Sequence, residues 1–297
     1  MTQPSSTTTL PAFTGAVRLA DWGVIRAAGA EARKFLHGQL TQDVELMGPN
    51  DVRLAGYCSA KGRLLASFVM WRDGADDVLL ACSADVLPAV LKRLTMFVLR
   101  AKCRLSDATA ELPLWGCVGD LPAGTLRLPD ATWAGTAVPR GLWVGATPPV
   151  AQAIDLPTWQ GLEAASGVAR IVAATVEQFV PQMVNLELVG GVNFKKGCYP
   201  GQEIVARSQY RGTLKRRAQV MTSDQPLQPG QEVFHDADPG QPAGMVVLSG
   251  SLPGAPAVAL VEVKLSALVG GSLHAGAPEG PLLRLAALPY ELPLETA

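Results

Sequence analysis

Apolar residues recur at intervals of three to four positions in two segments of the first hundred residues, 30–40 and 84–100. This spacing places them on one face of a helix, so each segment is predicted to form an amphipathic helix that packs against a core. The expected core-facing residues are Ala32, Phe35, Leu36 and Leu40 in the first helix, and Val86, Leu87, Val90, Leu91, Leu94, Phe97 and Val98 in the second.

Between these segments, two short apolar runs at 64–71 and 77–82 flank the sequence RDGAD. An Asp-Gly pair between apolar runs is a strong hairpin signal. The first part of the chain is therefore predicted to combine antiparallel strands with at least two helices.

The middle of the chain, about 119–149, is rich in Gly, Pro, Thr and Trp and contains short strand-like runs. A helix is predicted to follow, capped by Asp155. After Gly212 the pattern changes to apolar segments separated by Pro-Gly and Gly-rich turns, at 216–223, 231–236, 244–250, 257–263 and 281–288. These predict a small antiparallel barrel or sandwich.

The composition is that of an ordinary globular protein, with 48% hydrophobic and 17% charged residues among 297. Since single cores usually stop growing near ~250 residues, more than one core is expected.

No apolar run approaches the ~20 residues that cross a bilayer, and the first residues lack the basic and apolar parts of a signal peptide. We therefore expect a cytoplasmic protein without a membrane partner. The net charge of −1 gives no whole-protein electrostatic case for nucleic acid.

Cysteine and histidine are too scattered to predict a metal site. The odd number of cysteines and the absence of a CxxC pair also argue against a disulfide framework. The residues concerned are Cys58, Cys82, Cys103, Cys117, Cys198, His37, His235 and His274.

The most unusual stretch is KKGCYPGQE, 195–203. Its Pro-Gly pair has two interpretations: the middle of a type II turn, or Pro200 as the first residue of a helix that runs to Arg211 and stops at Gly212. We favour the helix. Cys198 would then lie just before a helix N-terminus and two residues after Lys196, and both features favour a thiolate. The alternative is that Cys198 is a small buried hydrophobic residue.

The same region carries a basic run that could bind an anionic small molecule or an RNA backbone, or could simply form a solvated face. It comprises Lys195, Lys196, Arg207, Arg211, Lys215, Arg216 and Arg217.

Four segments together resemble one family. FVPQMVNLELVGGVNFKKGCYPGQEIVAR (179–207) resembles the signature of the YgfZ family of folate-binding proteins, relatives of the glycine-cleavage T-protein (GcvT, aminomethyltransferase). ADWGVIRAAGAEARKFLHGQLTQDV (20–44) and YCSAKGRLLASF (57–68) are similar to its N-terminal blocks, and LPYELPL (288–294) to its closing segment.

The resemblance implies an α+β fold of T-protein type, with interlocked α+β modules followed by a C-terminal antiparallel β-barrel. We accordingly expect a disordered tail at 1–10, a folate-binding α+β region at 11–212 with modules at about 11–110 and 111–212, and the barrel at 213–297. It also implies tetrahydrofolate or a derivative as ligand. The residues expected near that ligand are Trp22, Trp159 and Arg207. Taken as single residues, the two tryptophans would more often be core residues than ligand contacts.

Two positions depart from the related proteins. T-proteins carry an acid in the strand that GRLLASFVMW resembles, where this chain has Ala66 and Ser67. Related proteins often have an acid just before the glycine matched by Gly167, where Ala165 and Ser166 stand and Glu163 comes earlier. The expected catalytic acid is thus missing, and no classical turnover is expected.

Three functions follow as hypotheses. The first is a folate-dependent accessory protein for iron–sulfur cluster assembly or repair, with iron–sulfur proteins or their assembly machinery as partners and an indirect effect on tRNA modification. Cys198 would carry the redox or cluster-linked chemistry and Lys196 would tune it, within a motif that includes Tyr199, Gly201, Gln202 and Glu203. The second is a folate-dependent aminomethyltransferase. The third, a tRNA-binding module, rests only on the basic run, and we expect no direct RNA binding.

Overall fold

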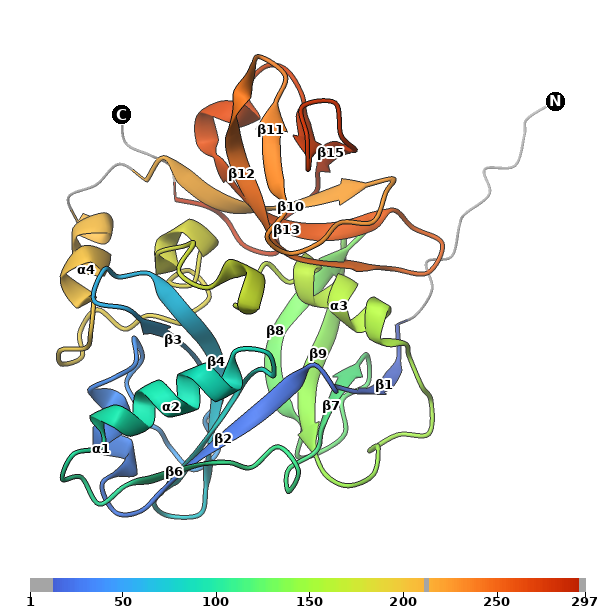
Figure 1. The fold of residues 1–297 in the computed structure, drawn as a ribbon. Helices are drawn as coiled ribbons and strands as arrows, with labels where there is room; N and C mark the ends of the chain where they lie inside the picture. Colours follow the sequence, from blue (N-terminus) through green and yellow to red (C-terminus); the bar gives the residue numbers. More distant parts are fainter. Residues whose placement is uncertain (1–12, 211–213, 294–297) are drawn as a thin grey trace.

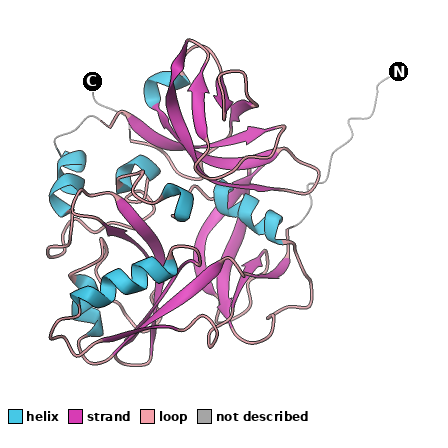
Figure 2. Cartoon of the chain, viewed as in Figure 1, coloured by secondary structure: helices cyan, strands magenta, loops and turns pink. Residues whose placement is uncertain are grey.

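The computed structural model describes residues 13–210 and 214–293, which form two antiparallel sheets and a closed barrel (Figure 1). Strands are the main regular secondary structure, and α3 (Leu156–Ala165) lies between the second sheet and the barrel (Figure 2). No helix in these two ranges is long and apolar enough to cross a membrane. The tail expected at 1–10 lies outside the described residues.

The first sheet has five strands in the order β3-β4-β5-β2-β6, with β2 (Trp22–Ala28), β3 (Arg53–Cys58), β4 (Leu64–Asp73), β5 (Asp77–Ser83) and β6 (Arg104–Asp107). The predicted hairpin between β4 and β5 is confirmed, and Gly74 at its tip has φ 71°. Both predicted helices, α1 (Ala32–His37) and α2 (Leu87–Phe97), cover one face of this sheet.

The inward face of α2 is shorter than the sequence pattern predicted. Leu87, Val90 and Leu94 are buried, but Phe97 is 45% exposed. The prediction that Phe97 faces the core is wrong because the helix ends there, beyond the part that packs on the sheet.

The second sheet has four strands in the order β1-β7-β9-β8, with β1 (Gly15–Arg18), β7 (Leu114–Val118), β8 (Leu126–Trp133) and β9 (Thr136–Val144). Because β1 pairs with β7 while β2 pairs with β5 and β6, consecutive strands enter different sheets. The two α+β modules are therefore interlocked. Helix α3 (Leu156–Ala165) begins where expected, since the Asp155 carboxylate accepts a 2.8 Å hydrogen bond from the Thr158 N–H.

The C-terminal part is a closed antiparallel barrel in the order β10-β13-β12-β11-β14-β15, which decides between the predicted barrel and sandwich. Its strands are β10 (Arg216–Ser223), β11 (Glu232–His235), β12 (Asp238–Ser251), β13 (Ala257–Lys264), β14 (Leu273–Ala275) and β15 (Leu282–Leu285). The segment before it contains the 3₁₀ helices η1 (Ala173–Thr175) and η2 (Pro181–Val184) and helix α4 (Gln202–Tyr210); η3 (Leu265–Leu268) follows β13.

One hydrophobic cluster joins all three parts. It contains residues of both sheets, of α3 and of the barrel strands β10, β12 and β13. Helix α3 lies directly against β12, where a side chain at Gly250 would overlap the main chain of Gly161. The contact leaves no room for a Cβ, so the position of the barrel on α3 depends on glycine at 250.

Candidate functional site

A small cavity lies between the two sheets, where the interlocked modules meet. Trp22 of β2, Ser67 of β4 and Arg140 of β9 line it together with Glu163 and Arg170, and its remaining walls are mainly apolar. Its volume is about 20 Å³, roughly the space of one water molecule.

Successive side chains of β4 point to opposite faces of the sheet. This alternation decides which of Ala66 and Ser67 faces the position where T-proteins carry their acid. Ser67 lines the cavity, whereas Ala66 packs in the other core, beneath α1 and α2. The Ser67 hydroxyl accepts a 3.0 Å hydrogen bond from the Ile171 N–H. A neutral hydroxyl that is already engaged therefore occupies this position.

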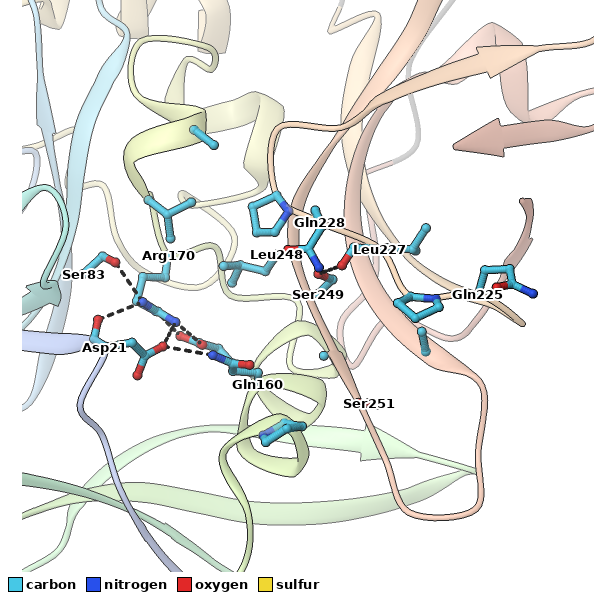
Figure 3. Close-up of a pocket in the computed structure, with 18 of the residues that line it drawn as sticks. Asp21, Ser83, Gln160, Arg170, Gln225, Leu227, Gln228, Leu248, Ser249 and Ser251 are labelled. Atoms are coloured by element: carbon cyan, nitrogen blue, oxygen red, sulfur yellow. Dashed lines mark hydrogen bonds and ion pairs between the residues drawn. The ribbon is translucent and has the colours of Figure 1, made fainter. Parts of the chain in front are cut away.

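A larger cleft of about 910 Å³ adjoins the cavity between the first sheet, α3 and the barrel (Figure 3). Ser83, Gln160 and Arg170 line one side, while the barrel contributes Leu248 and Ser249 among others on the opposite side. Glu163 and Arg170 border both spaces. The ion pair between them thus forms part of the wall that separates the cleft from the cavity.

Arg170 is the centre of a buried polar network. Its guanidinium binds both oxygens of Glu163 at 2.9 and 3.0 Å, the Asp21 carboxylate at 2.9 Å and the Ser83 hydroxyl at 2.9 Å. It also lies over the Trp22 ring at 4.9 Å. Burial alone would lower the pKa of Arg170, but the Glu163 and Asp21 carboxylates outweigh it and raise the pKa. Arg170 is therefore a permanent cation.

Arg140 is a buried cation of a different kind, because no carboxylate oxygen among the described residues lies within ion-pair distance of it. Its Nε donates to the Pro129 carbonyl at 2.9 Å and its Nη2 to the Ser166 hydroxyl at 2.7 Å. Burial lowers the pKa of Arg140 to about 10, against the opposing effect of Glu163 and Asp130. The group stays charged near neutral pH, so the cavity carries a positive charge that no direct ion pair neutralises.

Two buried polar atoms beside these spaces have no hydrogen-bond partner among the residues that the structure describes: Trp22 Nε1 at the cavity and Asp21 Oδ1 at the cleft. Unsatisfied buried groups are rare in proteins and costly, and they often mark positions where a ligand or water completes the pairing. The Trp22 indole donor and the Asp21 carboxylate acceptor are thus available to a bound molecule.

The structure separates the three residues expected near a ligand. Trp22 lines the cavity, but Trp159 is fully buried between Arg140, 5.7 Å from its ring centre, and Gly116. Trp159 supports Arg140 and lines neither space. Arg207 is exposed on α4, pairs with Glu203 at 3.5 Å, and also lines neither space. The geometry does not bring Arg207 to the tryptophans.

The Pro-Gly pair of the KGCYPGQE motif forms a turn. Gln202 N–H donates to the Tyr199 carbonyl at 3.2 Å, and Gly201 has φ 80°, as the third residue of a type II turn requires. The preference for Pro200 as the first helical residue was wrong, because a left-handed residue separates it from α4. The predicted helix itself is confirmed from Gln202 to Tyr210; its predicted end at Arg211 and Gly212 lies outside the described residues.

Gly201 also holds the motif against the loop between β3 and β4. A Cβ at Gly201 would lie 2.7 Å from the Gly62 Cα. We expect Gly201→Ala to lower the free energy of unfolding by about 3 kcal/mol, from left-handed strain plus this overlap. Gly74→Ala is the control: its φ is 71° but nothing lies within 4 Å, so only about 1 kcal/mol is expected. Urea unfolding measures both; equal losses would contradict the close packing.

Cys198 is exposed, which excludes the buried-hydrophobic alternative. The other four thiols are buried or half-buried, and burial raises the pKa of Cys58 and Cys82 to about 12 and of Cys103 and Cys117 to about 11. Cys198 lines neither the cavity nor the cleft, so the motif and the cavity are two separate places.

Lys196 ties the motif to the end of α1. Its ammonium donates to the carbonyls of His37 at 2.5 Å and Leu40 at 2.9 Å, and lies over the Tyr199 ring at 4.7 Å. Only 8% of Lys196 is exposed. Burial lowers its pKa to about 8, more than Asp43, Cys198 and Glu45 together raise it. Lys196 therefore anchors the loop that presents Cys198.

This lowered pKa predicts a pH effect on stability. Below pH 8, Lys196 is charged in both states and its burial penalises the folded state. Between about pH 8 and 10.4 the unfolded chain binds more protons, so the stability contributed by Lys196 rises with pH. The free energy of unfolding should therefore increase in the wild type relative to Lys196→Met across this range, by up to about 1.4 kcal/mol per pH unit. Urea unfolding of both proteins from pH 7 to 10 measures it; a constant difference would contradict the prediction.

The basic run does not form one exposed face. Lys196 and Arg217 are buried, and Arg217 binds Glu187 while Arg216 binds Glu262. Since these cations are used internally, the run offers little charge to an outside partner.

Sequence reasoning missed Arg140 and Arg170, although each carries a recognisable signal. Each is a lone arginine inside an apolar stretch, in AVPRGLWV and GVARIVAA. A charged residue in such a run is almost never fully buried unless its charge is used. What the sequence does not contain is their convergence on one cavity from β9 and from the segment after α3.

Comparisons with known proteins agree with this fold. No family model matches the sequence. The chain is 34% identical over 238 residues to the tRNA-modifying protein YgfZ of Photorhabdus laumondii, covering 72% of this chain and 71% of that protein. It is 31% identical over 245 residues to the tRNA-modifying protein YgfZ of Escherichia coli O157:H7, covering 74% of each. Among solved structures, the glycine cleavage system aminomethyltransferase T from Bartonella henselae aligns with TM-score 0.62 and 16% identity, covering 94% of this chain and 87% of that one.

Proposed function

Because the chain belongs to the YgfZ family, as its identity to those relatives over most of both lengths shows, we propose that it binds a reduced folate and supports iron–sulfur proteins as an accessory protein. The single observation that carries the folate part is the buried, incompletely paired polar set at the junction of the two sheets: Arg140, Trp22 Nε1 and Asp21 Oδ1.

The residues present fit the donor and acceptor pattern of tetrahydrofolate or a derivative. A pteridine ring carries N–H donors that suit Asp21 Oδ1 and a carbonyl acceptor that suits an indole N–H or a guanidinium, while the glutamate carboxylates of the ligand favour cationic surroundings. When bound, the folate would supply a reduced pteridine and a one-carbon carrier.

The cavity is much smaller than a pteridine ring, whereas the adjoining cleft has the size of a typical ligand site. Binding in the cavity therefore requires lining side chains to move. The Glu163–Arg170 pair separates the two spaces, so it is the wall that we propose rearranges when the ring enters from the cleft.

Aminomethyl transfer is the alternative, and the cavity argues against it. Ser67 stands where the T-protein strand supplies an acid, and its hydroxyl is held by the Ile171 N–H. Among the described residues, Glu163 is the one carboxylate in the cavity lining, and Arg170 engages both its oxygens. Neither group is free to act as a general base.

The iron–sulfur part of the proposal rests on the family and on the exposed thiol. Relatives are named tRNA-modifying proteins, and some tRNA modifications depend on iron–sulfur enzymes, so we propose an indirect effect of this chain on tRNA. Cys198, presented by the loop that Lys196 anchors, would carry the redox or cluster-linked step. Direct RNA binding is not proposed, because three cations of the basic run, Lys196, Arg216 and Arg217, are used internally.

A titration tests the folate part. Tetrahydrofolate should quench the tryptophan fluorescence of the purified protein saturably, since Trp22 borders the proposed site. In parallel, the protein should not release ammonia from an aminomethylated lipoyl carrier in the presence of tetrahydrofolate. Absence of saturable binding would refute the folate proposal, and robust ammonia release would establish the aminomethyltransferase instead.

A further inference from the structure

The end of α2 and the segment after it expose large apolar and basic side chains together. The apolar residues are Met96, Phe97 and Leu99, which are 66%, 45% and 85% exposed. The cations, all exposed, are Lys92, Arg93, Arg100, Lys102 and Arg104. We call these eight residues the α2 tip. No Asp or Glu occurs between residues 92 and 104, and the sequence reading overlooked this second basic stretch.

The cations of the α2 tip are unpaired. In the part of the chain that the structure describes, no carboxylate oxygen lies within 4 Å of a side-chain nitrogen of any of the five, whereas Arg26, Arg170, Arg216 and Arg217 all bind carboxylates. Glu31 is the neighbouring acid, and its carboxylate accepts a 2.6 Å hydrogen bond from the Lys102 main-chain N–H. The Arg93 guanidinium lies 5.9 Å from the centre of the Phe97 ring. The tip therefore carries five cations against the single nearby carboxylate of Glu31, so it keeps a positive charge.

The fold also gives the apolar residues no structural role. The face of α2 that packs on the sheet ends at Leu94, and the three apolar residues follow it into solvent. An exposed apolar centre surrounded by polar residues marks an interaction site, and Phe, Met and Arg are enriched at protein interfaces.

We propose that the α2 tip docks an acidic amphipathic helix of a partner protein, with the apolar face of that helix against Met96, Phe97 and Leu99. Charge complementarity selects an anionic partner. Single-stranded RNA is recognised by stacking on aromatic faces, and Phe97, the one aromatic residue of the tip, lies under Arg93. A membrane anchor needs a whole helix face free to lie in the interface, and α2 buries its apolar face in the core. The tip suits an acidic amphipathic helix better than either RNA or a membrane.

This inference rests on the proposed function for the identity of the partner, an iron–sulfur client or assembly protein, but its test does not. Ser83 and Asp85, just before α2, line the cleft. The apolar residues of the tip lie at the other end of this helix, whose eleven residues span roughly 16 Å. A partner on the tip would thus leave the cleft free to bind its ligand.

The test uses a fluorescent synthetic helix with leucines on one face and glutamates on the other as the acidic probe. The variant Met96→Ser, Leu99→Ser, Arg100→Glu, Lys102→Glu should bind it at least tenfold more weakly than the wild type by anisotropy, and salt should weaken wild-type binding. The control Val269→Ser, Lys215→Glu removes an exposed apolar residue and a cation from the barrel and should bind like the wild type.

Oligouridylate and phosphatidylglycerol vesicles are tested in the same way. Equal binding of the acidic helix by wild type and variant would overturn the proposal. The proposal would also be overturned if the wild type bound RNA or vesicles more tightly than the helix and the variant lost that binding. The tetrahydrofolate titration of the variant should match the wild type; if tetrahydrofolate does not bind even the wild type while the helix result holds, the folate proposal fails and the docking surface stands.

Discussion

Replacing Cys198 with alanine is expected to abolish support of iron–sulfur enzymes in a strain that lacks the family member, with a change in the free energy of unfolding within about 0.5 kcal/mol. The thiol is exposed, so alanine removes no core packing. The measurement is the activity of an iron–sulfur-dependent enzyme in the complemented strain, together with the level of a tRNA modification that such an enzyme makes.

Cys103→Ala is the matched control, because Cys103 is half-buried and burial raises its pKa to about 11. It should complement fully. Alkylation with site mapping near neutral pH should label Cys198 first, since the other four thiols are held in the neutral form. Full complementation by Cys198→Ala, with slow labelling at that position, would reduce the motif to a structural loop.

Removing the Arg140 charge is expected to weaken tetrahydrofolate binding by 10- to 100-fold, which corresponds to about 1.5–3 kcal/mol for a hydrogen bond to a charged group. Arg140→Met keeps an unbranched side chain at this position while removing the guanidinium that lies over Trp159. Trp22→Leu should cause a further loss, because Trp22 contributes both an aromatic wall and an unpaired N–H. Calorimetric titration of each variant measures the affinity.

Arg127→Met is the control, since Arg127 lies in β8 of the same sheet but is exposed and pairs with Asp130 at 3.4 Å. Its affinity should equal that of the wild type. Each variant is accepted only if its melting temperature shows that it is folded. Unchanged affinity in folded Arg140→Met and Trp22→Leu would remove the ligand from this cavity.

The parts of the fold that depend on local pattern could be predicted from the sequence. The β4–β5 hairpin, the Asp155-capped α3 and the five main barrel segments follow from dipeptides, spacing and turn residues that act over a few positions. Phe97 shows the limit of this reasoning. The helical spacing of apolar residues continues to Phe97, but α2 packs on the sheet only as far as Leu94, and that end point is set by the tertiary structure.

The candidate site was less predictable because its residues converge from distant segments. Which of Ala66 and Ser67 faces the cavity depends on how β4 lies in its sheet. Trp159 was expected at the ligand, but Arg140 from β9 and Gly116 from β7 enclose its ring. The motif alone identified Cys198 and Lys196 as candidate residues. It could not identify the carbonyls of His37 and Leu40 that hold Lys196, because these lie more than 150 positions earlier in the chain.

The most direct test of the central claim is a crystal structure of the protein grown with tetrahydrofolate. The account predicts electron density for the pteridine ring between Trp22, Ser67 and Arg140, with the Glu163–Arg170 pair displaced to admit it. Pteridine density anywhere else on the protein, with the cavity and this ion pair unchanged, would contradict it.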